Sequence, residues 1–207
     1  MTIPDTYDAR RGLRNWGMFG NNVDGDCIVV AIENLRMLHN VAAASTWKRF
    51  MYRLGFRPPH TPFVLQEYAD FLLTQGEKPS PSTGVDPLQF FTWLKVTKKI
   101  DDFQQIIIGQ NNNIFYDEKK NDLIREACVG WNGCLLTLYL TKHAYDTGLE
   151  HKPWSLLTTD PPSYSLAHAV AMVAYSKTSN AVVTWGMMKE MTIGFTDYTV
   201  YGCWVFR

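Results

Sequence analysis

The sequence predicts an α+β domain with a helical first half and an antiparallel β-sheet in its second half. Before residue 99, apolar residues recur at helical spacing in several stretches bounded by Ser, Asp, Pro or Gly. After residue 102, short runs of apolar and β-branched residues dominate. Because the helices come first and do not alternate with the strands, we expect the sheet to pack against the first helix.

The first predicted helix runs from Cys27 to about Ala44, and Asp24 or Asp26 can cap its N-terminus. Further helices are expected at 46–54, 62–75 and 86–98, with Gly55 and Gly76 ending two of them. Residues 77–84 are rich in Pro and Ser but too few to separate domains, so they are expected to form an internal loop. We therefore predict an extended lead-in at 1–20 followed by one domain at 21–207.

Strands are predicted in the second half wherever a short apolar run lies between turn signals. They are expected at 103–108, 133–140, 168–175, 181–186 and 199–206, with one helix at 117–129. Residues 109–113 and 176–180 form polar turns, and 141–167 is irregular with three prolines. The strands at 168–175 and 181–186 are close enough in sequence to form a hairpin.

The bulk composition argues against several classes of protein. The 207 residues include 20 basic and 20 acidic side chains, so there is no general argument for a nucleic-acid or membrane partner, and we expect neither. No apolar run reaches about 18 residues, and the N-terminus lacks the pattern of a secretory signal. Four cysteines in a chain of this length are expected to be reduced thiols.

One cysteine and one histidine are candidates for chemistry. Cys27 opens the first predicted helix, where the positive end of the helix dipole favours a thiolate. The alternative is a small apolar residue at the start of a core helix. His168 begins a predicted buried strand 168 − 27 = 141 residues later, and roughly 130–150 residues separate nucleophile and base in papain-type enzymes.

With these features the sequence resembles the papain-like cysteine peptidase superfamily. The resemblance rests on Cys27 at a helix start, the strand His168-Ala169-Val170, and Trp185-Gly186 one hairpin later. It is most similar to small papain-like proteins of bacteriophages and actinobacteria, through Gly25-Asp26-Cys27, Val183-Thr184-Trp185-Gly186 and Met191-Thr192. The resemblance implies a papain-like fold, with Cys27 as nucleophile and His168 as base.

The resemblance also implies an oxyanion donor and a group that orients the imidazole. Asn21, six residues before Cys27, stands where the family usually carries an oxyanion-hole Gln; the alternative is an ordinary turn residue. The orienting Asn of the family corresponds to Val183, which cannot accept the imidazole N–H. The adjacent Thr184 is expected to point to the opposite face of the strand. Asp160 or Asp197 can substitute only from a loop.

Two further residues near the predicted dyad have a functional and a structural interpretation. A carboxylate at Asp26 opposes ionisation of the Cys27 thiol unless it is turned away as the helix cap. Trp185 occupies the position that shields the histidine in the family; the alternative is a large core residue. No metal or cofactor is expected, because the other histidines and the pair Cys128 and Cys134 lack the spacing of ligands.

Two functions of different class follow. The first is a phage-encoded cysteine hydrolase that acts on a peptide, isopeptide or amide bond. The second is a catalytically silent papain-like scaffold that serves in a phage virion or binds a ligand, so enzymatic activity stays open. The expected partners are a protein or peptide and phage assembly neighbours, and the expected location is the virion or the host cytoplasm.

Overall fold

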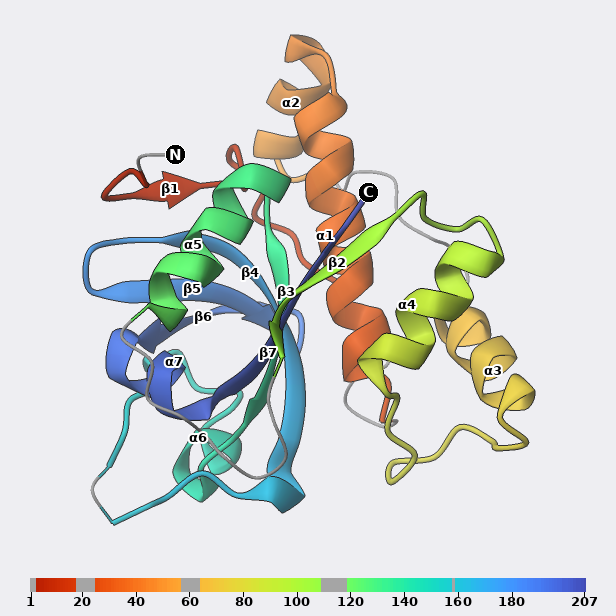
Figure 1. The fold of residues 1–207 in the computed structure, drawn as a ribbon. Helices are drawn as coiled ribbons and strands as arrows, with labels where there is room; N and C mark the ends of the chain where they lie inside the picture. The colour runs from red at the N-terminus through yellow and green to blue at the C-terminus, as the bar shows by residue number, and fades with distance from the viewer. Residues whose placement is uncertain (1–2, 18–24, 57–63, 109–118, 158) are drawn as a thin grey trace.

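The computed structural model describes residues 3–17, 25–56, 64–108, 119–157 and 159–207. In these ranges the first half of the chain is mainly helical and the second half mainly β-sheet, as predicted (Figure 1). The helices of the first half are α1 (Cys27–Ala43), α2 (Thr46–Arg53), α3 (Val64–Thr74) and α4 (Pro87–Val96). The later helices are α5 (Lys120–Trp131), α6 (Lys142–Asp146) and α7 (Ile193–Thr199), with a 3-10 turn η1 at Tyr164–Leu166.

The strands form one antiparallel sheet in the order β2-β7-β3-β4-β5-β6, with β1 paired to β4 outside this path. Its strands are β1 (Tyr7–Asp8), β2 (Phe103–Ile108), β3 (Cys134–Tyr139), β4 (Ala167–Tyr175), β5 (Ser179–Thr184), β6 (Met187–Thr192) and β7 (Val200–Phe206). The last strand, β7, therefore lies between β2 and β3. This order places β4, which carries His168, in the middle of the sheet.

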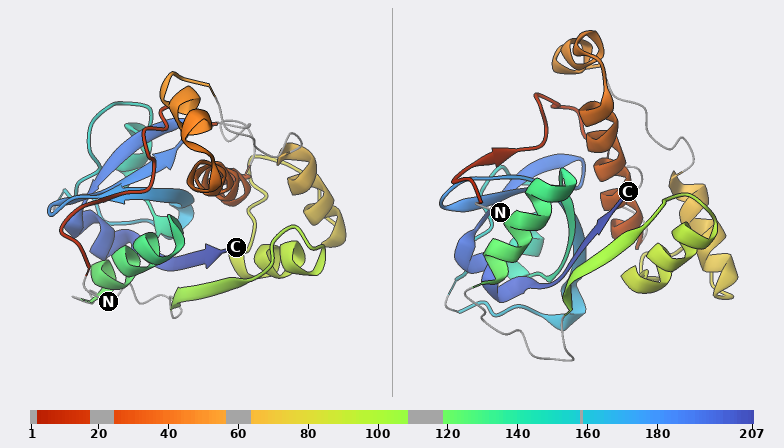
Figure 2. Two further views of the ribbon diagram at one scale, coloured as in Figure 1. Left: turned by 90° about the horizontal axis from the view of Figure 1, so that it is seen from above. Right: turned by 45° about the horizontal axis from the view of Figure 1, so that its top comes forward.

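Alternation along β4 builds two hydrophobic cores, one on each face of the sheet. Ala169 and Ala171 pack with buried residues of α1, such as Ile32. Val170 and Met172 face the other way, into a core shared with α5 and α7. Figure 2 shows α1 lying between the sheet and the pair formed by α3 and α4. The largely buried α1 thus holds its first residue, Cys27, against the sheet.

Local sequence signals account for several helix boundaries. Asp86 caps α4, since its Oδ1 accepts a hydrogen bond from the Gln89 N–H at 2.9 Å, and Pro87 follows as predicted. Ser45 occupies the N-cap of α2 in the same way. Within the described ranges, no helix is long and apolar enough to cross a membrane.

The structure differs from the sequence prediction at three places. Strand β6 and the helices α6 and α7 were not predicted, because each is short and β6 includes the charged pair Lys189 and Glu190. The lead-in contributes to the core, which its prediction as an extended segment did not include: Leu13 and Trp16 are buried beside α1. The predicted apolar stripe of the second helix faces solvent, since Trp47 is exposed.

Candidate active site

Cys27 is held at the start of α1 by a close approach between two backbone segments. The Gly25 N–H donates to the Ser80 carbonyl at 3.1 Å, which ties the residues before α1 to the loop before α4. The partly exposed Cys27 thiol lies within hydrogen-bonding reach of the Ala169 N–H on β4. Because Ala169 directly follows His168, the two predicted catalytic residues are brought to the same end of β4.

His168 lies at the second position of β4 and is only 8% exposed. Its Nε2 is 2.7 Å from the Thr184 Oγ1, at the end of β5. Burial lowers the pKa of His168 from 6.5 to about 4, so the imidazole is neutral at pH 7.

Trp185 covers the imidazole from one side. Its ring is stacked on His168, with the ring centroids 4.6 Å apart and an angle of 17° between the planes. Trp185 and Gly186 both have positive φ, at 45° and 73°, and form the two-residue turn between β5 and β6. A left-handed backbone is unfavourable for tryptophan, and the stacking on His168 offsets this cost.

Two tyrosines that the sequence analysis did not single out also belong to this region. The rings of Tyr139 and Tyr201 stack with centroids 4.3 Å apart, from the adjacent strands β3 and β7. The pKa of Tyr201 is raised to about 12 by burial first, then by Tyr139, with a smaller contribution from the Cys27 thiol. Tyr201 therefore lies near Cys27. The sequence pattern gives no signal for this, because both tyrosines sit in apolar strand segments.

Comparison with known proteins identifies the fold. No protein-family model and no curated protein sequence matches the chain. Among solved structures, xylellain, a cysteine protease from Xylella fastidiosa, matches with a TM-score of 0.64 and 11% identity, over 100% of this chain and 87% of its own. Digestive procathepsin L 3 of Tenebrio molitor matches with a TM-score of 0.61 and 8% identity, over 100% of this chain and 70% of its own. The Carica candamarcensis cysteine protease CMS1MS2, solved with E-64, matches with a TM-score of 0.51 and 13% identity, over 99% and 98%.

The chain has the papain-like fold. The predicted architecture is confirmed: a helical first half packs on an antiparallel sheet in the second. At these identities the likeness extends to the fold and not to the substrate.

Thr184 contacts the imidazole of His168 in this papain-like fold, through its Oγ1 at 2.7 Å from Nε2. Its predicted position on the face opposite Val183 is correct, but this position does not keep it away from His168. Val183 is buried on the α1 side of the sheet, so alternation does turn Thr184 to the other face, as predicted. His168 faces that same side, beside Trp185. The carboxylates of the two predicted substitutes bind other groups: Asp160 accepts hydrogen bonds from the N–H groups at the start of α6, and Asp197 accepts one from the Asn121 side chain.

The prediction of a thiolate at the helix N-terminus is also wrong for this structure. Burial, followed by the charge of Asp26, raises the pKa of Cys27 to about 11, while the N–H groups of Ala169 and Ile28 lower it. Asp26 occupies the N-cap position of α1, but its side chain makes no capping hydrogen bond. The fully buried carboxylate is therefore not a cap, and its charge opposes ionisation of the neighbouring thiol.

Replacing Asp26 by asparagine is expected to make Cys27 more reactive. The change removes a negative charge next to the thiol while keeping the side-chain shape, so the pKa of Cys27 falls and the thiolate fraction at pH 8 rises by about tenfold for each pKa unit. The measurement is the second-order rate of alkylation of Cys27 by iodoacetamide. An unchanged rate in a folded Asp26→Asn variant would show that this carboxylate does not control the thiol.

The remaining predicted features have simple outcomes. Asn21 lies outside the described residues. Within the described residues, no group of three or more His, Cys, Asp or Glu side chains could hold a metal ion. Cys128, Cys134 and Cys203 are buried free thiols in the core under α5, and the pKa of Cys134 is raised by its contacts with the other two.

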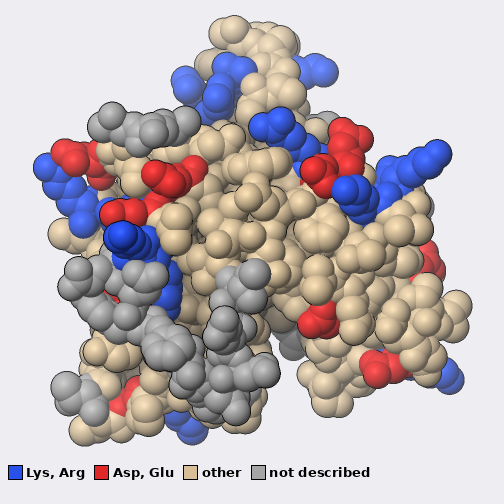
Figure 3. Space-filling view, in the orientation of Figure 1, with Lys and Arg blue, Asp and Glu red and all other residues tan. Residues whose placement is uncertain are grey.

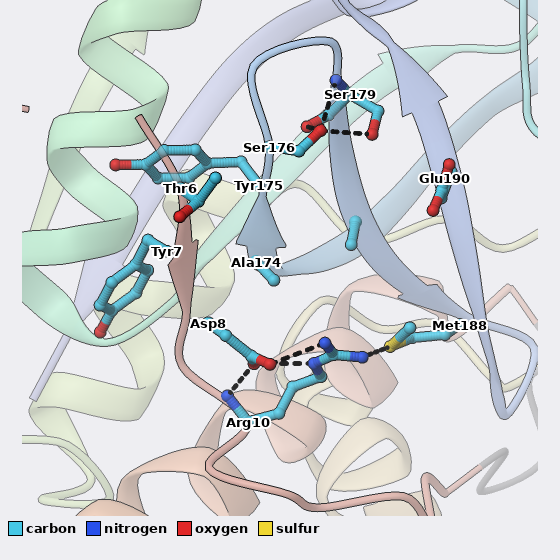
Figure 4. A pocket seen from close by; sticks show the side chains of 11 residues that line it. Thr6, Tyr7, Asp8, Arg10, Ala174, Tyr175, Ser176, Ser179, Met188 and Glu190 are labelled. Atoms are coloured by element: carbon cyan, nitrogen blue, oxygen red, sulfur yellow. Dashed lines mark hydrogen bonds and ion pairs between the residues drawn. The ribbon is translucent and has the colours of Figure 1, made fainter. Parts of the chain in front are cut away.

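A separate pocket of about 360 Å³ lies beside β1, at some distance in the sheet from His168 (Figure 4). It is lined by residues of β1, the β4–β5 turn and β6, and includes none of the predicted site residues. Arg10 crosses its floor and is held by Asp8 at 2.7 Å and by the Met188 sulfur at 2.8 Å. The pairing of β1 with β4 and the contact of Arg10 with Met188 hold the N-terminal segment to the sheet beside this pocket, which is separate from the site around Cys27.

Proposed function

We propose that the chain is a papain-like cysteine hydrolase in which Cys27 and His168 act on a peptide, isopeptide or amide bond. The observation that carries this proposal is the position of the Cys27 thiol against the Ala169 N–H, one residue from His168. Nucleophile and base thereby come from the start of the central helix and the start of the central strand of a fold shared with cysteine proteases.

The proposed chemistry assigns a different role to each nitrogen of His168. With Nε2–H donating to the Thr184 oxygen, Nδ1 keeps its lone pair and can accept the thiol proton as the Cys27 sulfur attacks the carbonyl carbon. The imidazolium then protonates the leaving amine, and water hydrolyses the thioester. The Cys27 N–H at the start of α1 and the side-chain amide of Asn21 would stabilise the oxyanion.

Thr184 is the proposed positioning residue for the imidazole. Its hydroxyl can fix the ring and the tautomer, as the family's asparagine does, but a neutral hydroxyl stabilises an imidazolium less than a carboxylate would. Trp185 excludes water from one face of the same ring. Both residues would keep the imidazole in one orientation. Neither carries a negative charge that would stabilise the imidazolium, in accord with the low pKa of His168.

The substrate class and the source rest on different support. The matched structures are cysteine proteases, and this favours a protein or peptide substrate. A phage origin, with phage proteins as assembly neighbours, is supported only by the sequence motifs around Cys27 and Trp185. Action in a virion or in the host cytoplasm follows from the same motifs.

The second candidate, a catalytically silent scaffold, is favoured by one specific observation. With pKa values of about 11 for Cys27 and about 4 for His168, both groups are neutral at pH 7, and proton transfer between them is unfavourable. The charge of Asp26 adds to this effect. A papain-like domain that binds a protein or ligand without turnover would tolerate both features.

The pH dependence of Cys27 alkylation distinguishes the two functions. Selective labelling of Cys27 alone does not, because Cys128, Cys134 and Cys203 are fully buried and are protected in either case. For a hydrolase, the iodoacetamide rate of the wild type has a component near neutral pH that disappears in a His168→Ala variant. For a silent scaffold, the rate rises only with direct ionisation of the thiol towards pH 11 and is the same in both proteins.

An active-site inhibitor provides a second readout. E-64 is bound by the Carica protease, so a hydrolase is expected to gain one covalent E-64 adduct at Cys27, detected by intact mass. The Cys27→Ser variant is the control and should gain none. Absence of both the adduct and the His168-dependent rate in a folded wild type would refute the hydrolase.

A further inference from the structure

The helix α2 displays an apolar face to solvent at the top of the molecule (Figure 1). Trp47, Phe50 and Leu54 fall on one side of this helix, and Phe56 follows its end. Trp47 is 67% exposed and Leu54 61%, and the Trp47 and Phe50 rings stack with centroids 5.6 Å apart. Of the residues of α2, Tyr52 is the buried one. An amphipathic helix normally turns this face to the core, so its exposure indicates a contact outside the chain.

Cationic side chains surround this apolar face. Lys48 and Arg53 are exposed on α2, and Arg11 and Arg14 are exposed on the adjoining N-terminal segment. That segment is fastened to the end of α2, because the Arg53 Nε donates to the Arg11 carbonyl at 3.2 Å and the Asn15 side chain donates to the Gly55 carbonyl. We call the exposed residues Arg11, Arg14, Trp47, Lys48, Phe50, Arg53, Leu54 and Phe56 the α2 tip.

No acidic residue occurs in the two segments that form the α2 tip, residues 9–17 and 43–56. Figure 3 shows blue side chains around the tan apolar tip and no red at the top of that view. Arg10 is excluded from the α2 tip, because Asp8 pairs its charge. In a chain with a net charge of zero, the α2 tip is therefore a local region of positive charge without acidic residues in its two segments.

We propose that the α2 tip docks on an anionic lipid surface. Aromatic side chains favour the boundary between lipid headgroups and acyl chains, and each Lys or Arg near an anionic membrane adds to the attraction. Interfacial helices lie in the membrane plane with their apolar face buried roughly 5–10 Å deep, and Trp47, Phe50 and Leu54 supply such a face on α2. The expectation of no membrane partner came from balanced charge totals, which do not reveal this segregation.

The shape and charge of the α2 tip argue against a second copy of the chain as its occupant. Two tips brought face to face would place their arginines and lysines together, with no acidic side chain in these segments to compensate. The α2 tip protrudes, and its cationic side chains surround its apolar ones. A lipid surface with anionic headgroups above an apolar interior complements this arrangement.

Sedimentation with vesicles tests the proposal. The full chain is expected to sediment with vesicles that contain phosphatidylglycerol and phosphatidylcholine in about equal amounts, and at least about tenfold less with pure phosphatidylcholine. A Trp47→Ser/Phe50→Ser variant should lose about tenfold or more of the binding. A Lys48→Gln/Arg11→Gln/Arg14→Gln variant should bind more weakly and with a smaller dependence on salt.

A matched control uses exposed apolar residues elsewhere. Leu73 and Val96 are both 75% exposed, at α3 and α4, and a Leu73→Ser/Val96→Ser variant should bind like the wild type. Circular dichroism melting verifies that each variant is folded. The proposal is overturned if the wild type stays in the supernatant with anionic vesicles, or if the control loses as much binding as the tip variant. If the wild type does not sediment with anionic vesicles but binds an acidic protein through the α2 tip, the proposal is overturned and the tip is assigned to a protein partner.

Discussion

A Gly25→Ala substitution is expected to disrupt the site around Cys27. A Cβ at Gly25 would lie 2.3 Å from the Thr83 carbonyl oxygen and 2.9 Å from its carbon, and these are backbone atoms that cannot rotate away. The loop before α4 or the residues that lead into α1 must therefore move. We expect a loss of about 2–3 kcal/mol in the free energy of unfolding, which lowers the melting temperature by roughly 4–12 °C.

The same displacement should reach Cys27, two residues later. A shift of about 1 Å between reacting groups can reduce a rate by about 100-fold, so any His168-dependent alkylation of Cys27 should be largely lost. Gly84→Ala is the matched control. Gly84 follows Thr83 in the loop before α4, and nothing lies within 4 Å of a Cβ added there. Equal melting temperatures and alkylation rates for the two variants would contradict this view of Gly25.

The position of Cys27 and the neighbouring helix could be predicted from local signals alone. Apolar residues at helical spacing begin at Ile28, and their uninterrupted pattern gave the start of α1 correctly. His168 was placed correctly at the start of a strand, because a short apolar run follows it. Periodicity reports such local features well, since it depends on which face of an element is buried.

The environment of the two groups could not be predicted in this way. Alternation correctly separates Val183 from Thr184, but it cannot say on which face of the neighbouring strand His168 lies. The pKa of Cys27 depends on how deeply Asp26 and the thiol are enclosed, and this is a property of the packed sheet and helix.

Strand β6 was missed for a related reason. Its Lys189 is buried and donates hydrogen bonds to the carbonyls of Thr147 and Glu150. A lysine in the sequence normally indicates an exposed position, so it gives no signal for a buried strand residue. Trp185, in the turn before β6, has a backbone conformation that is usually adopted by Gly or Asn, so its residue type does not predict a turn at this position. In both cases, contacts with residues distant in sequence override the local preference.

The burial of His168 is expected to destabilise the protein in acid. The pKa is about 4 in the folded protein and near 6.5 in the unfolded chain, so both states are neutral at His168 above pH 7. As the pH falls below 6.5, the unfolded chain binds a proton that the folded protein does not bind until about pH 4. The free energy of unfolding should therefore fall by about 3 kcal/mol between pH 7 and pH 4 from this residue alone.

A His168→Gln variant isolates this contribution, because its amide can still bond to Thr184 but does not titrate. Urea unfolding at several pH values should show a decline between pH 7 and pH 4 that is smaller by about 3 kcal/mol in the variant. The pKa of His39 is also lowered by burial, but His39 is present in both proteins, so its contribution cancels in the difference between their pH profiles. His39→Gln serves as the matched control and should remove only its own part of the decline.

The same experiment bears on how the site works. A thiolate–imidazolium pair at rest would raise the pKa of His168 above its usual value, so the wild type would lose no stability from this residue between pH 7 and pH 4. A wild type and a His168→Gln variant with parallel pH profiles would therefore contradict a neutral resting site. If the profiles diverge as expected, the resting pair is neutral, and in the proposed hydrolase Cys27 would lose its proton during the attack and not before it. The contact between Thr184 and the imidazole would then position His168 to accept that proton.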